Sequence, residues 1–227
     1  GGKLAVSHPH SDSIEALENC HTHSNVSLES LAVRFQPTKF GYKKGKLKYF
    51  HVGFQRFYPL WMEAYRGKKF KMLEIGLDSG LGSLLWKTYF PCAELWGLEY
   101  SASKASTSGA REINTIRGDQ GDTEFLKNEF LGKSGGNFDI IVDDGGHHFE
   151  QQTASYEVLF DVALKPGGLY AIEDIETSYW AKNVDLYGQP VTRGGCSGQD
   201  TVVNLFKNIV DVINKKFFDK TFSVFGA

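Results

Sequence analysis

The chain has 227 residues, of which 41% are hydrophobic and 23% charged, and its formal net charge is −2. This length suits one sizeable core and is short for two domains. Without a basic excess, nucleic acid and anionic membranes are not expected as main partners. No apolar run approaches the roughly 18 residues that span a bilayer. We therefore expect a soluble protein, cytoplasmic by default, although the Gly-Gly start leaves room for a native targeting segment that was removed.

The first 26 residues and the cysteines are predicted to carry no chemistry. Four histidines lie between His8 and His23, and a flexible, solvated leader explains them better than a metal-binding tract. The cysteines are widely spaced and odd in number, so we expect neither a disulfide framework nor a zinc site. They are Cys20, Cys92 and Cys196.

Residues 27–66 are predicted to form a helical segment that precedes the main domain. In the stretch SLESLAVRF, from Ser27 to Phe35, apolar residues recur at helical spacing and would share one face. Residues 36–53 are basic and contain glycine, which is typical of a loop. A second amphipathic helix is predicted over residues 54–65.

Residues 67–227 alternate short apolar runs with helical patterns. Strands separated by helices form βαβ units with right-handed crossovers and a mostly parallel sheet. The pattern therefore predicts one Rossmann-like α/β domain with helices on both faces. Strands are predicted over 70–76, 94–100, 113–119, 138–144 and 169–174. Helices are predicted over 81–90, 123–131, 149–163 and 200–216.

Three further stretches complete this pattern. Residues 165–168 (KPGG) predict a turn, and residues 179–199 predict a long polar loop of the kind that is more often functional than idle. Residues 221–225 could open a sixth strand. The chain ends at Ala227, before the closing strand hairpin expected of this fold, so either the C-terminus is truncated or the final strands differ.

The carboxyl ends of the first three predicted strands carry residues suited to a nucleoside cofactor. After Gly76 a glycine-containing turn leads into a helix, whose first amides would face a ligand. The second strand ends at Glu99, which could accept hydrogen bonds from ribose hydroxyls. The third ends at Asp119-Gln120, within reach of an adenine edge. The candidate cofactor residues are Glu74, Gly76, Gly80, Ser83, Glu99, Asp119, Gln120 and Asp143.

This turn by itself fits any tight strand-to-helix connection. Together with Glu99 it fits either a nicotinamide cofactor or S-adenosylmethionine (SAM), and two details favour SAM. The turn lacks the clean GxGxxG that cradles a pyrophosphate. Glu74, just before the first glycine, would face the cationic methionine end of SAM better than a diphosphate.

The fourth and fifth predicted strands end in acidic residues, in the stretches DDGGHH (143–148) and ED (173–174). Neighbouring strands would bring Asp144, Glu173 and Asp174 together at one edge of the sheet. A divalent cation would relieve their repulsion, and ligation by oxygen suits Mg²⁺, Ca²⁺ or Mn²⁺. The competing interpretation is that one acid caps a helix and another pairs with a lysine or arginine.

A histidine beside such a metal site suits the activation of a hydroxyl. An alcohol is a poor nucleophile near pH 7, and coordination with a nearby base makes it reactive. We predict that Asp144 and His147 are the catalytic residues, with His147 as the base. His148, which begins the next helix and would point elsewhere, is predicted to be structural or to support the site residues from behind. The predicted reaction transfers the methyl group of SAM to a hydroxyl held in near-attack geometry.

The sequence around these residues resembles that of the macrocin O-methyltransferase family of class I SAM-dependent methyltransferases. The resemblance covers about residues 27–216, and its most specific stretches are DDGGH and IEDIETSYW. It implies Mg²⁺ ligands at Asp144, Glu173 and Asp174, and a general base at His147. It implies cofactor contacts at Glu74, Gly76, Glu99, Asp119 and Gln120.

The resemblance also implies a class of acceptor. Family members methylate sugar hydroxyls on macrolide antibiotics and are typically oligomeric, so we expect a sugar or glycosylated small molecule and a homo-oligomer. His51, Phe54 and Tyr58 would lie in an N-terminal segment that closes over the site. The chain departs from the family at residues 37–39 and at Gly146, which leaves the acceptor open. A nicotinamide-dependent oxidoreductase and an inactive cofactor-binding or scaffold domain are the alternatives.

Overall fold

A computed structural model describes most of the chain. The described residues are 26–40, 42–43, 46–47, 54–181, 183–186, 189–191, 194 and 200–221. The predicted leader, His51 and the predicted strand beyond residue 221 lie outside them. No helix within these ranges is both long and apolar enough to cross a membrane.

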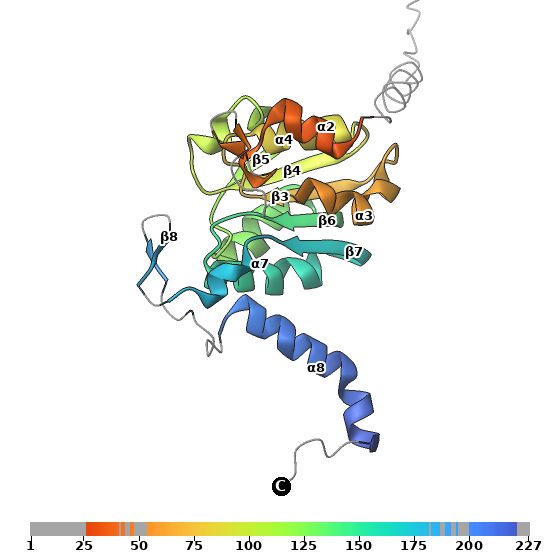
Figure 1. The fold of residues 1–227 in the computed structure, drawn as a ribbon, viewed down its shortest axis with the longest axis vertical. Helices are drawn as coiled ribbons and strands as arrows, with labels where there is room; N and C mark the ends of the chain where they lie inside the picture. Colours follow the sequence, from red (N-terminus) through yellow and green to blue (C-terminus); the bar gives the residue numbers. More distant parts are fainter. Residues whose placement is uncertain are drawn as a thin grey trace, which may run out of the picture.

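Five parallel strands form the centre of the fold, in the order β5-β4-β3-β6-β7 (Figure 1). The strands are β3 (Lys71–Ile75), β4 (Glu94–Glu99), β5 (Asn114–Arg117), β6 (Phe138–Asp143) and β7 (Leu164–Ile172). The chain runs outward from β3 to β5 and then returns to place β6 on the other side of β3. A switch point between β3 and β6 is where such sheets bind ligands. The predicted Rossmann-like α/β fold is confirmed.

The central strands are buried on both faces, as their continuous apolar runs predict. Side chains alternate along a strand, so neighbouring residues enter opposite layers. Met72 and its partner Ile140 pack into the core on the side of α2 and α4. Leu73 and its partner Ile141 pack into the core on the side of α7. The sheet therefore has helices on both faces.

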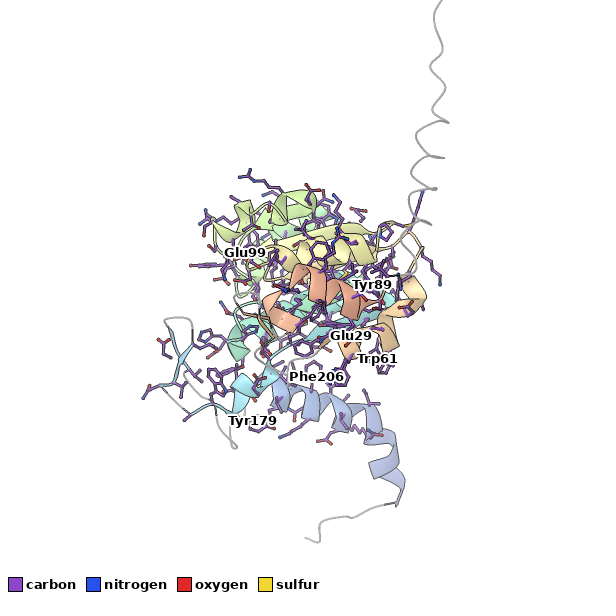
Figure 2. The ribbon with its side chains drawn as sticks, turned by 45° about the horizontal axis from the view of Figure 1, so that its top comes forward. Glu29, Trp61, Tyr89, Glu99, Tyr179 and Phe206 are labelled. Atoms are coloured by element: carbon purple, nitrogen blue, oxygen red, sulfur yellow. The ribbon has the colours of Figure 1, made fainter. Side chains whose placement is uncertain are left out.

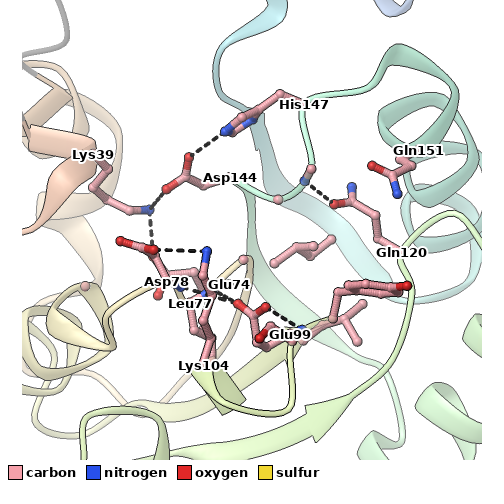
Figure 3. Close-up of a pocket in the computed structure, with 18 of the residues that line it drawn as sticks. Lys39, Glu74, Leu77, Asp78, Glu99, Lys104, Gln120, Asp144, His147 and Gln151 are labelled. Atoms are coloured by element: carbon pink, nitrogen blue, oxygen red, sulfur yellow. Dashed lines mark hydrogen bonds and ion pairs between the residues drawn. The ribbon is translucent and has the colours of Figure 1, made fainter. Parts of the chain in front are cut away.

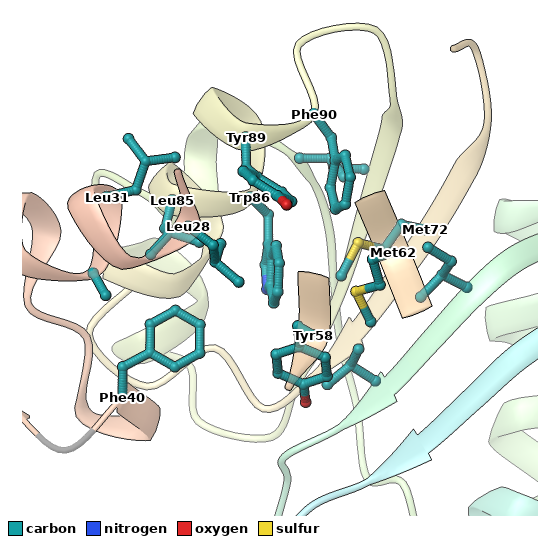
Figure 4. Packing of buried hydrophobic residues seen from close by; sticks show 14 of the residues in the cluster. Leu28, Leu31, Phe40, Tyr58, Met62, Met72, Leu85, Trp86, Tyr89 and Phe90 are labelled. Atoms are coloured by element: carbon teal, nitrogen blue, oxygen red, sulfur yellow. The ribbon is translucent and has the colours of Figure 1, made fainter. Parts of the chain in front are cut away.

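Residues 27–66 contribute to the first of these cores. The helices on this face are α2 (Leu28–Phe35), α3 (Tyr58–Met62) and α4 (Leu81–Tyr89). Trp86 of α4 stands among aromatic rings from the N-terminal segment (Figure 4). Its ring centroid lies 5.4 Å from that of Tyr58 and 6.1 Å from that of Phe40, both edge-on. The N-terminal segment is thus fixed to the sheet by buried side chains and reaches the carboxyl ends of its strands.

The second face is covered by α5 (Thr123–Phe125), the π-helix η7 (Leu126–Phe130), α6 (Leu131–Ser134) and α7 (Phe149–Val162). The predicted helix over 123–131 is therefore a chain of three short pieces. Helix α8 (Val202–Thr221) begins against α7, where Phe206 meets Tyr156 edge-on at 5.2 Å, and then extends away from the sheet (Figures 1 and 2). The first two turns of α8 therefore anchor this helix to α7.

Shorter elements occupy the connections. They are η1 (Thr38–Phe40), β1 (Tyr42–Lys43), β2 (Lys46–Leu47), η3 (Phe54–Arg56), η4 (Glu63–Tyr65), η5 (Lys104–Ser106), η6 (Ala110–Glu112), η8 (Ile175–Tyr179), β8 (Asp185–Leu186) and β9 (Gln189–Pro190). Four of these, which form two strand pairs, lie where a loop was predicted. Strands β1 and β2 pair within the basic stretch 36–53, and β8 pairs with β9 within 179–199.

Two predicted elements differ from the structure because of prolines. The single helix predicted over 54–65 is divided into η3, α3 and η4. The reason is Pro59 at the start of α3, which has no N–H to continue a helix from the preceding turn.

The turn predicted at 165–168 lies inside β7. The pairing with β6 jumps from Phe138↔Leu164 to Ile140↔Leu169. Pro166 and the glycines after it therefore form a bulge on an edge strand, where a missing donor is tolerated.

The prediction that the chain has no disulfide is wrong. Cys92, which follows Pro91 beyond the end of α4, is disulfide-bonded. Its partner lies outside the described residues. A bridge needs two Cα atoms within about 7 Å of each other, and that proximity comes from the fold, so neither the odd number of cysteines nor their spacing could reveal it.

Gly76 allows β3 and β6 to approach each other at the switch point. Its φ is +82°, and an added Cβ would lie 2.1 Å from the Asp144 carbonyl oxygen. We expect Gly76→Ala to lower the free energy of unfolding by about 3 kcal/mol or more, because both the dihedral and the backbone contact become unfavourable. Urea unfolding measures the loss. Gly67→Ala is the control, since Gly67 has φ +69° with no atom within 4 Å of the added Cβ, and should cost only about 1–2 kcal/mol. Equal losses of unfolding free energy in Gly76→Ala and Gly67→Ala would contradict a role for the close contact between Gly76 and the Asp144 carbonyl.

Candidate active site

A cavity of about 590 Å³ lies along the carboxyl ends of β3, β4, β5 and β6 (Figure 3). This is the edge at which open α/β sheets bind ligands. Eight of the predicted site residues line it: Glu74, Gly76, Glu99, Asp119, Gln120, Asp144, His147 and Asp174. The other four, Gly80, Ser83, Asp143 and Glu173, are not among its lining residues.

Glu99 shapes the turn that follows β3. Its carboxylate accepts hydrogen bonds from the backbone amides of Leu77 at 2.8 Å, Asp78 at 3.3 Å and Ser101 at 2.8 Å. The side chain therefore holds the turn after β3 against the end of β4 while it lines the cavity. The predicted hydrogen bonds from Glu99 to ribose hydroxyls stay a prediction.

Two other predicted cofactor residues belong to the helix that follows this turn. Gly80, with φ +77°, is the N-cap of α4, and an added Cβ would lie 2.4 Å from the Thr107 hydroxyl. Ser83 is buried one turn into α4. Gly82 lies between them and does line the cavity. The backbone at the start of α4 thus faces the cavity, whereas Gly80 and Ser83 serve the packing behind it.

Gln120 and Asp143 form a buried network beneath the loop that carries the acidic site. The Gln120 amide nitrogen donates to Asp143 Oδ2 at 2.9 Å, and its oxygen accepts from the Gly146 amide at 2.9 Å. Asp143 is fully buried and also accepts from the Ser155 hydroxyl at 2.8 Å. Burial raises the pKa of Asp143, against the hydrogen bonds, which lower it. These side chains therefore hold the loop 144–147 in place.

Asp144, His147 and Asp174 converge at the end of the cavity nearest β6 and β7. The His147 Nε2 atom lies 3.4 Å from Asp174 Oδ2 and 3.8 Å from Asp144 Oδ1. One ligand atom from each of the three residues can be chosen so that all lie within 4.8 Å of one another. Two carboxylates and an imidazole at this spacing could hold a divalent cation.

The backbone at this end of the cavity is strained. His147 has φ +56° and Asp174 has φ +53°, a region that residues other than glycine rarely adopt. The Thr177 hydroxyl donates to the His147 carbonyl at 2.7 Å and links the two loops. Each such conformation costs about 1–3 kcal/mol, and such strain clusters at functional sites. The strained backbone thus places the His147 and Asp174 side chains next to each other at a cost in folding stability.

Glu173 lies in a different group from its neighbour Asp174. It is buried, and its carboxylate accepts hydrogen bonds from the Tyr58 hydroxyl and, at 3.3 Å, from Lys39 Nζ. The pKa of Glu173 is raised to about 8, first by burial and then by the charge of Asp144. The structure thus brings Asp144 and Asp174 together with His147, and holds the third predicted metal ligand against the N-terminal segment.

Sequence reasoning missed Lys39. The Lys39 ammonium lies 2.6 Å from Glu74 Oε1 and 3.2 Å from Asp144 Oδ2 (Figure 3). It also lies 3.3 Å from Glu173 Oε1. The predicted alternative of an acid paired with a lysine therefore holds for these carboxylates. A lysine in a basic loop, 35 positions before Glu74, carries no local signal of burial. Its position next to Phe40, which is buried, is the one hint that this loop enters the core.

His148 contacts the β8–β9 hairpin and, against the prediction that it points elsewhere, lines the cavity. Its Nε2 atom lies 3.1 Å from the Leu186 carbonyl oxygen. Leu186 in turn lines the cavity and packs with Phe149 and Val191. His148 therefore fastens the β8–β9 hairpin beside the acidic end of the cavity, where it forms part of the wall.

Comparison with known proteins identifies relatives with a shared chemistry, although no protein-family model matches the sequence. The mycinamicin VI 2''-O-methyltransferase of Micromonospora griseorubida is 35% identical over 193 residues, which are 82% of this chain and 44% of that enzyme. The L-olivosyl-oleandolide 3-O-methyltransferase of Streptomyces antibioticus is 30% identical over 200 residues, 85% of this chain and 47% of that enzyme. The demethylmacrocin O-methyltransferase of Streptomyces fradiae is 34% identical over 166 residues, 70% and 39% respectively.

Solved structures of a relative lead to the same family. The MycE methyltransferase from the mycinamycin biosynthetic pathway, in complex with Mg and S-adenosylhomocysteine (SAH), matches with a TM-score of 0.66 and 29% identity over 89% of this chain and 52% of that one. Its complex with Mg, SAH and mycinamycin VI matches with a TM-score of 0.68 and 26% identity, over 100% and 65%.

These matches confirm the resemblance read from the sequence and give no support to the oxidoreductase or inactive-domain alternatives. The chain spans about half the length of the curated relatives it matches. By sequence and by fold, it belongs to the family of the macrocin and mycinamicin O-methyltransferases.

Proposed function

We propose that this chain is a SAM-dependent, divalent-metal-assisted O-methyltransferase that acts on a hydroxyl of a sugar or glycosylated small molecule. The observation that carries the proposal is the convergence of Asp144, His147 and Asp174 at one end of a cavity. Glu99 and the turn after β3 lie at its other end. One cavity thus offers a place for a nucleoside and a place for proton removal.

The residues of the acidic end fit a hard divalent ion. Asp144 and Asp174 offer carboxylate oxygens, which suit Mg²⁺ or Mn²⁺. Within the described chain, Oε2 of Glu74 and Oε2 of Glu173 are buried and have no hydrogen-bond partner. Buried carboxylate oxygens without partners are costly. These two belong to the group around Lys39, next to the acidic end, and add to the negative charge that a cation there would offset. Asp144 and Asp174 would hold the ion, with Glu173 beside them.

The chain's own residues supply positioning and proton transfer. When bound, SAM would supply the methyl group and the divalent ion would lower the pKa of the acceptor hydroxyl. His147 would take the hydroxyl proton at a ring nitrogen, a step for which a histidine is well suited near neutral pH. Asp174 Oδ2, 3.4 Å from His147 Nε2, would orient the ring. The cavity walls would hold both reactants in line.

Three observations support the proposed cofactor and the proposed class of acceptor. The MycE complexes contain Mg and SAH, and one contains mycinamycin VI. The curated relatives are named for methylation of sugar-bearing molecules. The cavity extends to His148 and Leu186 on the β8–β9 side, beyond the strand ends that carry the predicted cofactor residues. The division at residues 26 and 66, the closing of residues 27–66 over the site and the homo-oligomer stay predictions.

The cofactor assignment predicts that Glu99→Ala weakens binding of SAH by about tenfold or more. A hydrogen bond to a charged group contributes about 1.5–3 kcal/mol, and the turn after β3 would lose its anchors on Glu99 as well. Isothermal titration with SAH measures the change. Glu94→Gln is the matched control at the exposed start of the same strand and should bind as the wild type does. Unchanged affinity in Glu99→Ala would overturn the ribose assignment.

A further inference from the structure

A single ammonium group is buried among the carboxylates of the site. The side chain of Lys39 is 5% exposed and contacts carboxylates that follow or end three different strands: Glu74, Asp144 and Glu173. Trp86 completes the surroundings, with its ring centroid 5.9 Å from Lys39 Nζ. Three carboxylate oxygens within 3.3 Å of Nζ favour the charged form of the amine. Lys39 therefore carries a positive charge into the core of the site.

Asp144 belongs to two groups at once. Its Oδ2 atom lies 3.2 Å from Lys39 Nζ, whereas its Oδ1 atom lies 3.8 Å from His147 Nε2. The first group contains the ammonium, and the second contains the residues that could hold a divalent ion. A cation in the second group and the ammonium in the first would share one carboxylate. Two positive charges that share a carboxylate in a poorly solvated site repel each other strongly.

We propose that Lys39 is the resident counter-cation of the carboxylate cluster and that it opposes the binding of the divalent ion. This inference rests on the metal site of the proposed function. In the absence of the ion, the ammonium neutralises part of the buried negative charge and keeps Glu74, Asp144 and Glu173 together. When the ion binds, the charge of Lys39 reduces its affinity, so that the ion can be exchanged.

The position of Lys39 also couples the cation to the N-terminal segment. Lys39 belongs to η1, next to Phe40, which packs in the same core as Leu28 and Leu31 of α2. The contacts of the ammonium are ionic links between residues 28–40 and the ends of β3, β6 and β7. A divalent ion that takes over the neutralisation of Asp144 would loosen one of these links. Cation binding and docking of the segment should therefore respond to each other.

Lys39→Met tests the proposal, because methionine fills a similar volume without the charge. The probe is Mn²⁺, added to the metal-free protein and followed by electron paramagnetic resonance and by the melting temperature. We expect Lys39→Met to bind Mn²⁺ at least tenfold more tightly than the wild type. It should also melt at a lower temperature in EDTA and gain more from Mn²⁺. Lys39→Arg, which keeps the charge, should bind Mn²⁺ within about threefold of the wild type.

Lys165→Met is the matched control for loss of a lysine. Lys165 forms an ion pair with Asp139 at 2.8 Å, near the start of β6 at the opposite end of the sheet, and its loss should leave Mn²⁺ affinity unchanged. If Lys39→Met does not fold in EDTA, Lys39→Gln replaces it, since its amide still donates hydrogen bonds to the carboxylates. Equal or weaker Mn²⁺ affinity in the neutral variants, with Mn²⁺ bound by the wild type, overturns the inference alone. A wild type that binds SAH but no Mn²⁺ overturns the metal site of the proposed function as well.

Discussion

His147→Ala should lower the turnover number by about 10²–10⁴-fold, the usual contribution of a general base, while SAH binds as in the wild type. The expectation follows from the position of the ring. Its Nε2 atom lies within 4 Å of carboxylates on two different strand ends, at the acidic end of the cavity and away from the turn after β3. Loss of the ring should therefore affect proton removal and spare the nucleoside end. Steady-state kinetics with a glycosylated acceptor and titration with SAH measure the two effects separately.

The neighbouring histidine is the matched control. His148→Ala removes a ring that fastens the β8–β9 hairpin through the Leu186 carbonyl, so it should raise the Michaelis constant for the acceptor more than it lowers turnover.

The backbone of His147 is strained by its positive φ. A second variant, His147→Gly, relieves that strain and so separates effects on folding from effects on the reaction. The glycine variant should be as inactive as the alanine variant and at least as stable. Equal losses of turnover and SAH affinity in both variants would assign His147 a structural role.

The sequence was sufficient to predict the part of the site that depends on sheet topology. Parallel strands place their carboxyl ends at one edge, so residues that end apolar runs must meet there. This rule correctly placed Glu99, Asp119, Asp144 and Asp174 around one cavity. It also made β6 and β7 neighbours, as observed. The rule needs only the order of the elements and their hydrophobic pattern, both of which are local properties of the sequence.

Side-chain direction and long-range partners could not be predicted in this way. Glu173 and Asp174 are adjacent in sequence, but backbone reversal at Asp174, with φ +53°, sends them into different groups. Gln120 lines the cavity, but its hydrogen bonds to Asp143 and Gly146 could not be predicted. Lys39 reaches the site from η1 of the N-terminal segment. Such contacts depend on the folded positions of segments that are distant in sequence, for which hydrophobic periodicity carries no information.

Asp174→Asn should reduce turnover by about 10²–10³-fold and weaken the binding of Mn²⁺. Charge stabilisation by a metal contributes several kcal/mol to catalysis, and about 3–4 kcal/mol corresponds to this loss of rate. Asparagine has nearly the same shape as aspartate and also tolerates the left-handed conformation, so the loop should keep its course. Turnover in EDTA, with and without added Mg²⁺, and Mn²⁺ titration measure the effect. The wild type should lose its activity in EDTA and recover it with Mg²⁺.

The exposed Glu176, two residues further along in η8, provides the control, and Glu176→Gln should keep both activity and Mn²⁺ affinity. Asp174 is more informative than Asp144, because Asp144 also pairs with Lys39 and its loss would disturb two cations together. Unchanged Mn²⁺ affinity in Asp174→Asn, with turnover still reduced, would mean that Asp174 acts on the His147 ring and leave Asp144 as the ligand. Full activity of the wild type in EDTA would remove the divalent ion from the reaction. Proton removal would then depend on His147 and its two carboxylate neighbours alone.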